Sequence, residues 1–157
     1  MLFVSLAVVI AAAGCGGEAA EGESADGSGN AVTEVTIQPV GNQMKYEQTE
    51  FTVPAGEEIT LTFENTATSP AMEHNVVILT SNDDAVVNRV GQAAMQAADN
   101  GYVPDDEAIL AATDLAAPGE TVSVPFTAPS EPGTYRYICT YPGHYTVMQG
   151  TMTVVAS

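Results

Sequence analysis

Basic residues are scarce in this sequence. Three Lys and Arg stand against 20 Asp and Glu, which gives a formal net charge of −17 at pH 7. Surfaces that bind nucleic acid or anionic lipid need clusters of basic side chains, so the composition argues against both. It leaves open a basic partner, an uncharged apolar partner, or an acidity that only keeps the surface solvated.

Cysteine and histidine are also scarce, with two of each in 157 residues. In an exported protein two cysteines first suggest a disulfide. Cys15 follows an apolar segment and opens a stretch of small and acidic residues, whereas Cys139 lies in a strand-like run. We therefore do not expect a bridge between them.

Long apolar runs are missing too, because the uncharged stretch from Leu2 to Ala13 is shorter than the roughly 20 residues that span a membrane. Its length matches the hydrophobic region of a signal peptide, which we place at residues 1–14. The segment from Ala12 to Cys15 resembles a lipoprotein cleavage box, although Ala12 replaces the usual Leu and no basic residue precedes the run. We expect lipidation at Cys15, with plain secretion as the alternative, on the periplasmic side of the cell membrane.

Residues 15–31 consist mostly of Gly, Ala, Ser, Glu and Asp and are expected to form a flexible tether. The remaining part, about 125 residues from 32 to 157, is long enough for one compact core. Short β-branched and aromatic segments separated by Pro-Gly turns predict an all-β sandwich there. The expected strands are Val32–Val40, Gln48–Val53, Glu58–Asn65, His74–Thr80, Glu120–Ala128, Gly133–Thr140 and Met148–Val155.

The β pattern is interrupted between Ser81 and Leu115. Asn82 or Asp83 can cap a helix, and apolar residues recur along one side of it as far as about residue 98. Asn100-Gly101 would end the insertion, which we place at residues 82–100. We expect this helix to cover one sheet edge.

The segment from Cys139 to Met148 carries the clearest chemical signal. It places a thiol, the imidazole of His144 and a thioether around a Pro-Gly turn. Type 1 copper sites combine two His and one Cys with a weak axial Met. The only other histidine is His74, so the count of ligands closes without a spare imidazole.

Each of these residues also has another interpretation. Singly, each is more often an inert buried side chain, and only their joint spacing favours a metal site. Structural zinc prefers several cysteines, and a thioether is a poor zinc ligand. A Cys-His nucleophilic enzyme would leave Met148 and His74 without a role, so we expect no enzyme.

These motifs resemble the cupredoxin family of blue copper proteins, in particular its azurin and auracyanin branch. The resemblance covers Val32 to Val155 and rests on Met72-Glu73-His74-Asn75 and on four residues between Cys139 and His144, then three before Met148. It implies an eight-stranded Greek-key sandwich, a monomer, with one copper ion at one end. It also implies that Asn75 hydrogen-bonds near Thr140, and that the carbonyl of Glu73, where azurins have Gly, is a possible weak fifth ligand.

The function that follows from this resemblance is one-electron transfer between Cu(II) and Cu(I). The resemblance implies a membrane quinol-oxidising complex as donor and a c-type cytochrome or an oxidase as acceptor, docking near His144. Met72, Pro142 and Tyr145 are the candidates for the rim of the docking surface. A periplasmic copper delivery or storage protein is the alternative, and a metal-free adhesion module is a third.

Overall fold

The structure of the protein is a computed structural model that describes residues 30–156. Cys15, the expected signal peptide and most of the expected tether lie outside the described residues. Between residues 30 and 156, no helix combines the length and the apolar character needed to cross a membrane.

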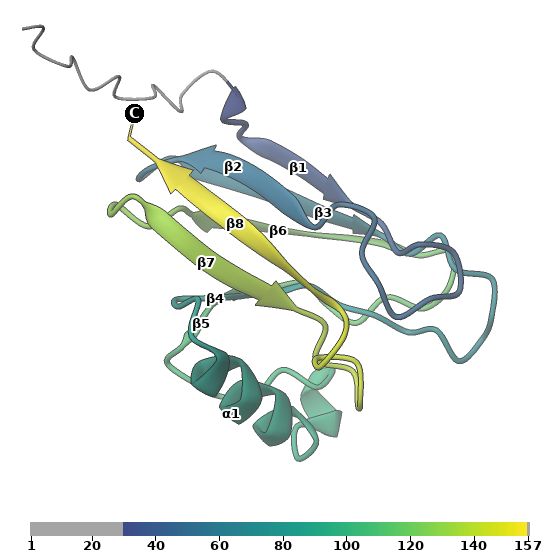
Figure 1. The fold of residues 1–157 in the computed structure, drawn as a ribbon. Coiled ribbons are helices and arrows are strands. Elements are labelled where there is room, and N and C mark those ends of the chain that lie inside the picture. The colour runs from purple at the N-terminus through teal and green to yellow at the C-terminus, as the bar shows by residue number, and fades with distance from the viewer. Residues whose placement is uncertain (1–29, 157) are drawn as a thin grey trace, which may run out of the picture.

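Two β-sheets stacked face to face make up the body of the molecule (Figure 1). The smaller sheet has the order β1-β3-β6, formed by Glu34–Ile37, Glu58–Glu64 and Thr121–Thr127. The larger sheet has the order β2-β8-β7-β4-β5, formed by Glu50–Pro54, Gln149–Val155, Gly133–Ile138, Val77–Leu79 and Ile109–Ala112. The predicted eight-stranded sandwich is confirmed.

The core lies between the sheets, and β3 shows why. Ile59, Leu61 and Phe63 alternate with polar residues, and their side chains are completely buried. Alternation places every second side chain of a strand on the same face. From the larger sheet, Tyr137 and Met152 complete the same apolar cluster. Each such side chain contributes about 1.5 to 3 kcal/mol by leaving water.

The strand expected from His74 to Thr80 is shorter than predicted. The ladder begins at Val77, and His74 makes only an isolated bridge with Ala116. Side chains take the place of ladder partners between them: the amide of Val76 donates to the hydroxyl of Thr113 at 3.0 Å. Side chains that compete for backbone groups end regular pairing in this way.

The insertion after β4 contains one element that the sequence did not predict. Helix α1 spans Asp84–Ala94 and is capped by the carboxylate of Asp83, as expected, and a short 3₁₀ turn follows at Ala98–Asn100. The chain then forms β5, which pairs antiparallel with β4. The edge of the large sheet is therefore a strand of the insertion itself.

Helix α1 lies beneath β4 and β5 in Figure 1. Val87 and Val90 of the helix belong to one apolar cluster with Val77, Leu79 and Ile138 of the sheet. These strand residues point away from the main core, so the helix covers the outer face of the large sheet. The expectation that it covers a sheet edge was wrong, because β5 occupies that place.

Candidate metal centre

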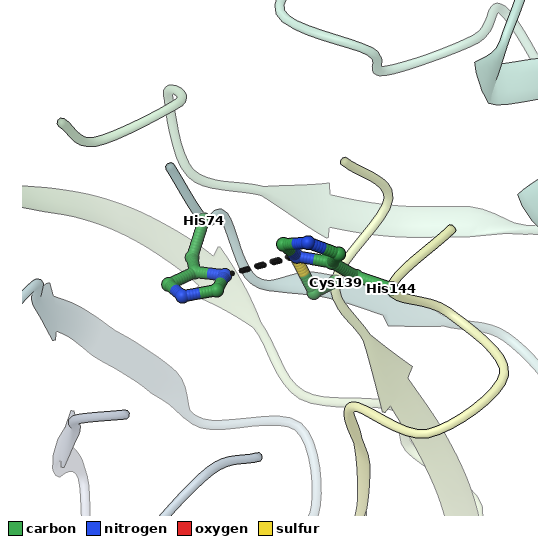
Figure 2. Close-up of side chains that lie close together, drawn as sticks. All are labelled: His74, Cys139 and His144. Carbon is green, nitrogen blue, oxygen red and sulfur yellow. Dashed lines mark hydrogen bonds between the residues drawn. The ribbon is translucent and has the colours of Figure 1, made fainter. Parts of the chain in front are cut away.

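Three side chains from two distant parts of the chain converge at one end of the sandwich. Figure 2 shows the rings of His74 and His144 facing one another with Cys139 beside them. Their Nδ1 atoms lie 3.1 Å apart, and the Cys139 Sγ lies 3.8 Å from Nδ1 of His74 and 3.6 Å from Nδ1 of His144. All three residues are buried.

The size of this triangle fits a metal ion. Metal bonds of about 2.0 Å to nitrogen and about 2.3 Å to sulfur, at angles between roughly 100° and 120°, span separations of about 3 to 4 Å between the donor atoms. The observed sides fall in that range. Two imidazoles and a thiolate are also the equatorial donors of a type 1 copper site. The residues present therefore fit copper.

The loop between β7 and β8 brings three of the expected ligands together. Cys139 directly follows β7 and Met148 directly precedes β8, and the amide of Cys139 donates to the carbonyl of Met148 at 3.0 Å. His144 lies in a turn between them, and Gly143 in this turn has a left-handed φ of 84°. The side chain of Met148 is completely buried and belongs to the same core cluster as Cys139.

His74 comes from the opposite direction and is fixed by the backbone. Its amide donates to the carbonyl of Ala116 at 3.2 Å, and the amide of Ala116 donates back at 2.9 Å. Phe63 of the smaller sheet packs edge-on against the imidazole, with the ring centroids 6.4 Å apart. The Nδ1 of His74 is consequently held toward His144.

Burial sets the protonation states of the metal-free site. Desolvation, followed by the nearby His144, lowers the pKa of His74 to about 4, and desolvation also lowers the pKa of His144. Desolvation raises the pKa of Cys139 to about 12, against a smaller opposing effect of the amides of Asn75 and Tyr141. At neutral pH both imidazoles are therefore neutral, and the thiol must lose a proton to bind a metal.

Asn75 joins the His74 segment to the loop. Its Nδ2 donates to the hydroxyl of Thr140 at 2.8 Å, and the amide of Thr140 donates to its Oδ1 at 2.9 Å. The same Nδ2 donates to the carbonyl of Gly101 at 3.2 Å. One buried amide thus connects the two ligand-bearing segments with the insertion.

Sequence reasoning missed two residues that support the site. The hydroxyl of Tyr46 donates to the carbonyl of Asn75 at 2.6 Å. The Nδ2 of Asn65 donates to the carbonyls of Met72 and Ala116, both at 2.8 Å. Neither residue belongs to a motif, and an Asn at the end of an expected strand was the only available signal.

Comparison with known proteins decides the family. A sequence model described as copper-binding proteins of the plastocyanin/azurin family matches residues 33–155. The chain belongs to the plastocyanin/azurin family. Auracyanin-A of Chloroflexus aurantiacus is 38% identical over 156 residues, which cover 98% of this chain and 93% of that protein. Azurin iso-2 of Methylomonas is 38% identical over 118 residues, covering 71% and 90%.

Solved structures agree with this membership in the plastocyanin/azurin family. Dithionite-reduced auracyanin from Roseiflexus castenholzii has a TM-score of 0.74 and 42% identity, covering 80% of this chain and 99% of that one. Auracyanin A from Chloroflexus aurantiacus, a "blue" copper protein, has a TM-score of 0.71 and 39% identity, covering 78% and 98%. The protein is therefore a copper-binding electron carrier and not an enzyme.

Within this plastocyanin/azurin fold, the three residues expected at the docking rim differ in exposure. Pro142 is exposed, Met72 is half-buried, and Tyr145 is half-buried because its ring lies against Gly91 of helix α1. A Cβ at position 91 would overlap the ring atoms of Tyr145. Glu73 is half-buried beside His74.

A second link between the helix and the loop from Cys139 to Met148 runs through Arg136 of β7. This side chain hydrogen-bonds Asn82 and Asp84 at the start of the helix and also donates to the side chain of Gln149. Gln149 in turn donates to the carbonyl of Tyr145 at 2.6 Å. The insertion therefore holds the loop that carries His144 from outside.

Proposed function

We propose that His74, Cys139, His144 and Met148 hold one copper ion in a type 1 site. The observation that carries this proposal is the buried triangle formed by the donor atoms of His74, Cys139 and His144, all within 4.8 Å of one another. Met148 is completely buried in the same apolar cluster as Cys139 and would supply the thioether that such sites use. The carbonyl of Glu73 is proposed as a weak further donor.

The bound copper supplies one-electron chemistry by alternating between Cu(II) and Cu(I). The contribution of the chain is to hold the donors in one arrangement for both oxidation states. The hydrogen bonds from Asn75 to Thr140 and from Tyr46 to Asn75 favour that role, because outer contacts orient ligands and limit their rearrangement. A site that rearranges little exchanges electrons faster.

The partners proposed are a membrane quinol-oxidising complex as electron donor and a c-type cytochrome or oxidase as acceptor. His144, which is 5% exposed, is the ligand placed nearest to solvent, and Met72, Pro142 and Tyr145 are proposed around it. Transient electron-transfer complexes have small interfaces, so few residues suffice. A monomer working outside the cytoplasm, tethered by residues 15–31 through a lipid on Cys15, would meet such partners at the membrane surface.

A copper delivery function is less well supported. Delivery requires that a partner reach the metal and replace its ligands, yet His74 is completely buried and both histidines belong to one site. Stopped-flow mixing distinguishes the two functions, since a carrier exchanges electrons with a redox partner and retains its copper.

The visible spectrum of the protein loaded with Cu(II) tests the ligand set. We expect an intense band near about 600 nm from charge transfer between thiolate and copper. Cys139→Ala should abolish the band, whereas Met148→Leu should keep it and raise the reduction potential, because Cu(II) loses a donor. Met152→Leu, at a buried methionine of the same strand region, is the control and should change neither. A colourless loaded protein would overturn the proposal.

A further inference from the structure

We propose that a surface formed by Tyr102 and Tyr141, continued by a pocket at Asp99 and Asp114, binds Lys or Arg side chains of a basic redox partner. This cation-binding surface goes beyond the apolar rim expected around His144. The inference rests on the proposed electron-transfer function, because it concerns the partner with which electrons are exchanged.

Two neighbouring tyrosines form the centre of the surface. The rings of Tyr102 and Tyr141 meet edge to face with centroids 5.2 Å apart, and both residues are only half-buried. The ring of Tyr141 also lies against the imidazole of His144, with centroids 4.9 Å apart. Aromatic faces attract ammonium and guanidinium groups, and tyrosines are frequent energetic centres of interfaces. A cation bound here would lie one aromatic ring away from a proposed copper ligand.

Tyr102 adopts an unfavourable backbone conformation and lies outside both apolar clusters. Its φ of 63° is left-handed, which is costly for a bulky side chain, and Gly101 before it has a φ of 59°. Tyr102 belongs to neither apolar cluster of the described residues. The strained backbone is fixed by a hydrogen bond from the Tyr102 amide to Ala97 and by the one from Asn75 to Gly101. Backbone strain of this kind is concentrated at functional sites.

Negative charge lies next to Tyr102. A pocket of about 390 Å³ is lined by Gly101, the residue before Tyr102, and by Asp99 and Asp114. Neither aspartate makes an ion pair among residues 30–156.

Both arginines of the chain are paired with other acidic residues. Of its three basic residues, Arg89 pairs with Asp106 and Arg136 pairs with Asp84. Lys45 is exposed on the loop between β1 and β2. A net charge of −17 attracts a basic protein over long distances. The pocket and the tyrosines would form the contact site for its basic side chains.

Electron exchange with a lysine-rich cytochrome c tests the surface at low ionic strength. We expect the second-order rate constant to fall about tenfold in Asp99→Asn/Asp114→Asn, within the range of electrostatic steering, and to converge with that of the parent protein in 1 M salt. The matched control, Glu57→Gln/Glu131→Gln, removes the same charge from turns at the opposite end of the sandwich. It should lose less than about twofold. Equal losses in both double variants would show that only net charge matters and would overturn the proposal.

The tyrosine pair is tested by Tyr102→Asn, because asparagine tolerates the left-handed backbone. We expect binding of the cytochrome to weaken about two- to fivefold, as for an exposed cation–π contact, with the visible band unchanged. Binding is measured from amide chemical shifts of isotope-labelled protein, which requires neither copper nor electron transfer. Unchanged affinity, or shifts confined to regions away from residues 99–103 and 141, would contradict the inference. An absent copper band would instead overturn only the proposed function.

Discussion

The two regions that carry the proposed copper ligands are held by different means. The segment around His74 is fixed from inside, by paired hydrogen bonds with Ala116 and by the ring of Phe63 in the core. The loop from Cys139 to Met148 is bonded to Asn75 through Thr140 and is also held from outside, by helix α1 acting on Tyr145. We therefore expect core stability and site geometry to change together in the first region and more independently in the second.

Phe63→Ala should disturb the segment around His74 and have the largest effect on stability and on the copper spectrum. Removing a completely buried ring is expected to lower the free energy of unfolding by about 3 to 5 kcal/mol and to free the imidazole of His74. Urea unfolding of the copper-free protein and the visible spectrum of the loaded protein measure the two effects. Phe126→Ala, in the same sandwich beside Ile59, is the control. It should cost stability while leaving the spectrum unchanged, and an unaltered spectrum in both variants would contradict the coupling.

Gly91→Ala should disturb the second region at a smaller cost. The added methyl group overlaps the ring of Tyr145, so the ring or the helix must move, at about 1 to 3 kcal/mol. We expect a shifted copper spectrum and faster copper loss, because Tyr145 is the residue after His144 and its displacement would move the imidazole. In Gly91→Ala/Tyr145→Ala the clash is absent. The double variant should therefore lose less stability than the sum of the losses in the two single variants. Additive effects would mean that the helix does not position the loop.

The smallest expected effect concerns protons released on metal binding, which come from Cys139 and not from His74. His74 has a pKa lowered to about 4, so it is already neutral above pH 6.5 and releases no proton on binding metal. Cys139 has a pKa raised to about 12, so its thiol is protonated and each bound ion displaces one proton. Affinity for Cu(I), measured by chelator competition, should rise tenfold, about 1.4 kcal/mol, per pH unit from about 7 to 9. A flat profile, or two protons per ion, would contradict this assignment.

Much of the site could be predicted from the sequence because its signals are local. Cys139, His144 and Met148 lie on one loop, and His74 is the only other histidine. The fold class followed from alternation, as in Ile59, Leu61 and Phe63. Strand β5 could not be predicted, because its short segment Ile109–Ala112 has no alternation and its four residues are all half-buried.

The supporting contacts escaped prediction for another reason. The contact of Gly91 with Tyr145 and the bond from Tyr46 to Asn75 join residues that are distant in the sequence and belong to no spacing pattern. A glycine within a helix gives no sign of the ring that will lie on it. Such pairs are fixed only when the sheets and the helix have packed.

Burial of Cys139 also protects the protein before copper arrives. Oxidants and alkylating agents react with the thiolate, and a pKa of about 12 leaves on the order of one molecule in 100,000 ionised at pH 7. The sulfur atom is in addition completely covered by neighbouring side chains. The newly folded, metal-free chain can therefore wait in an oxidising compartment without losing its thiol to sulfenic acid or to a disulfide with another molecule.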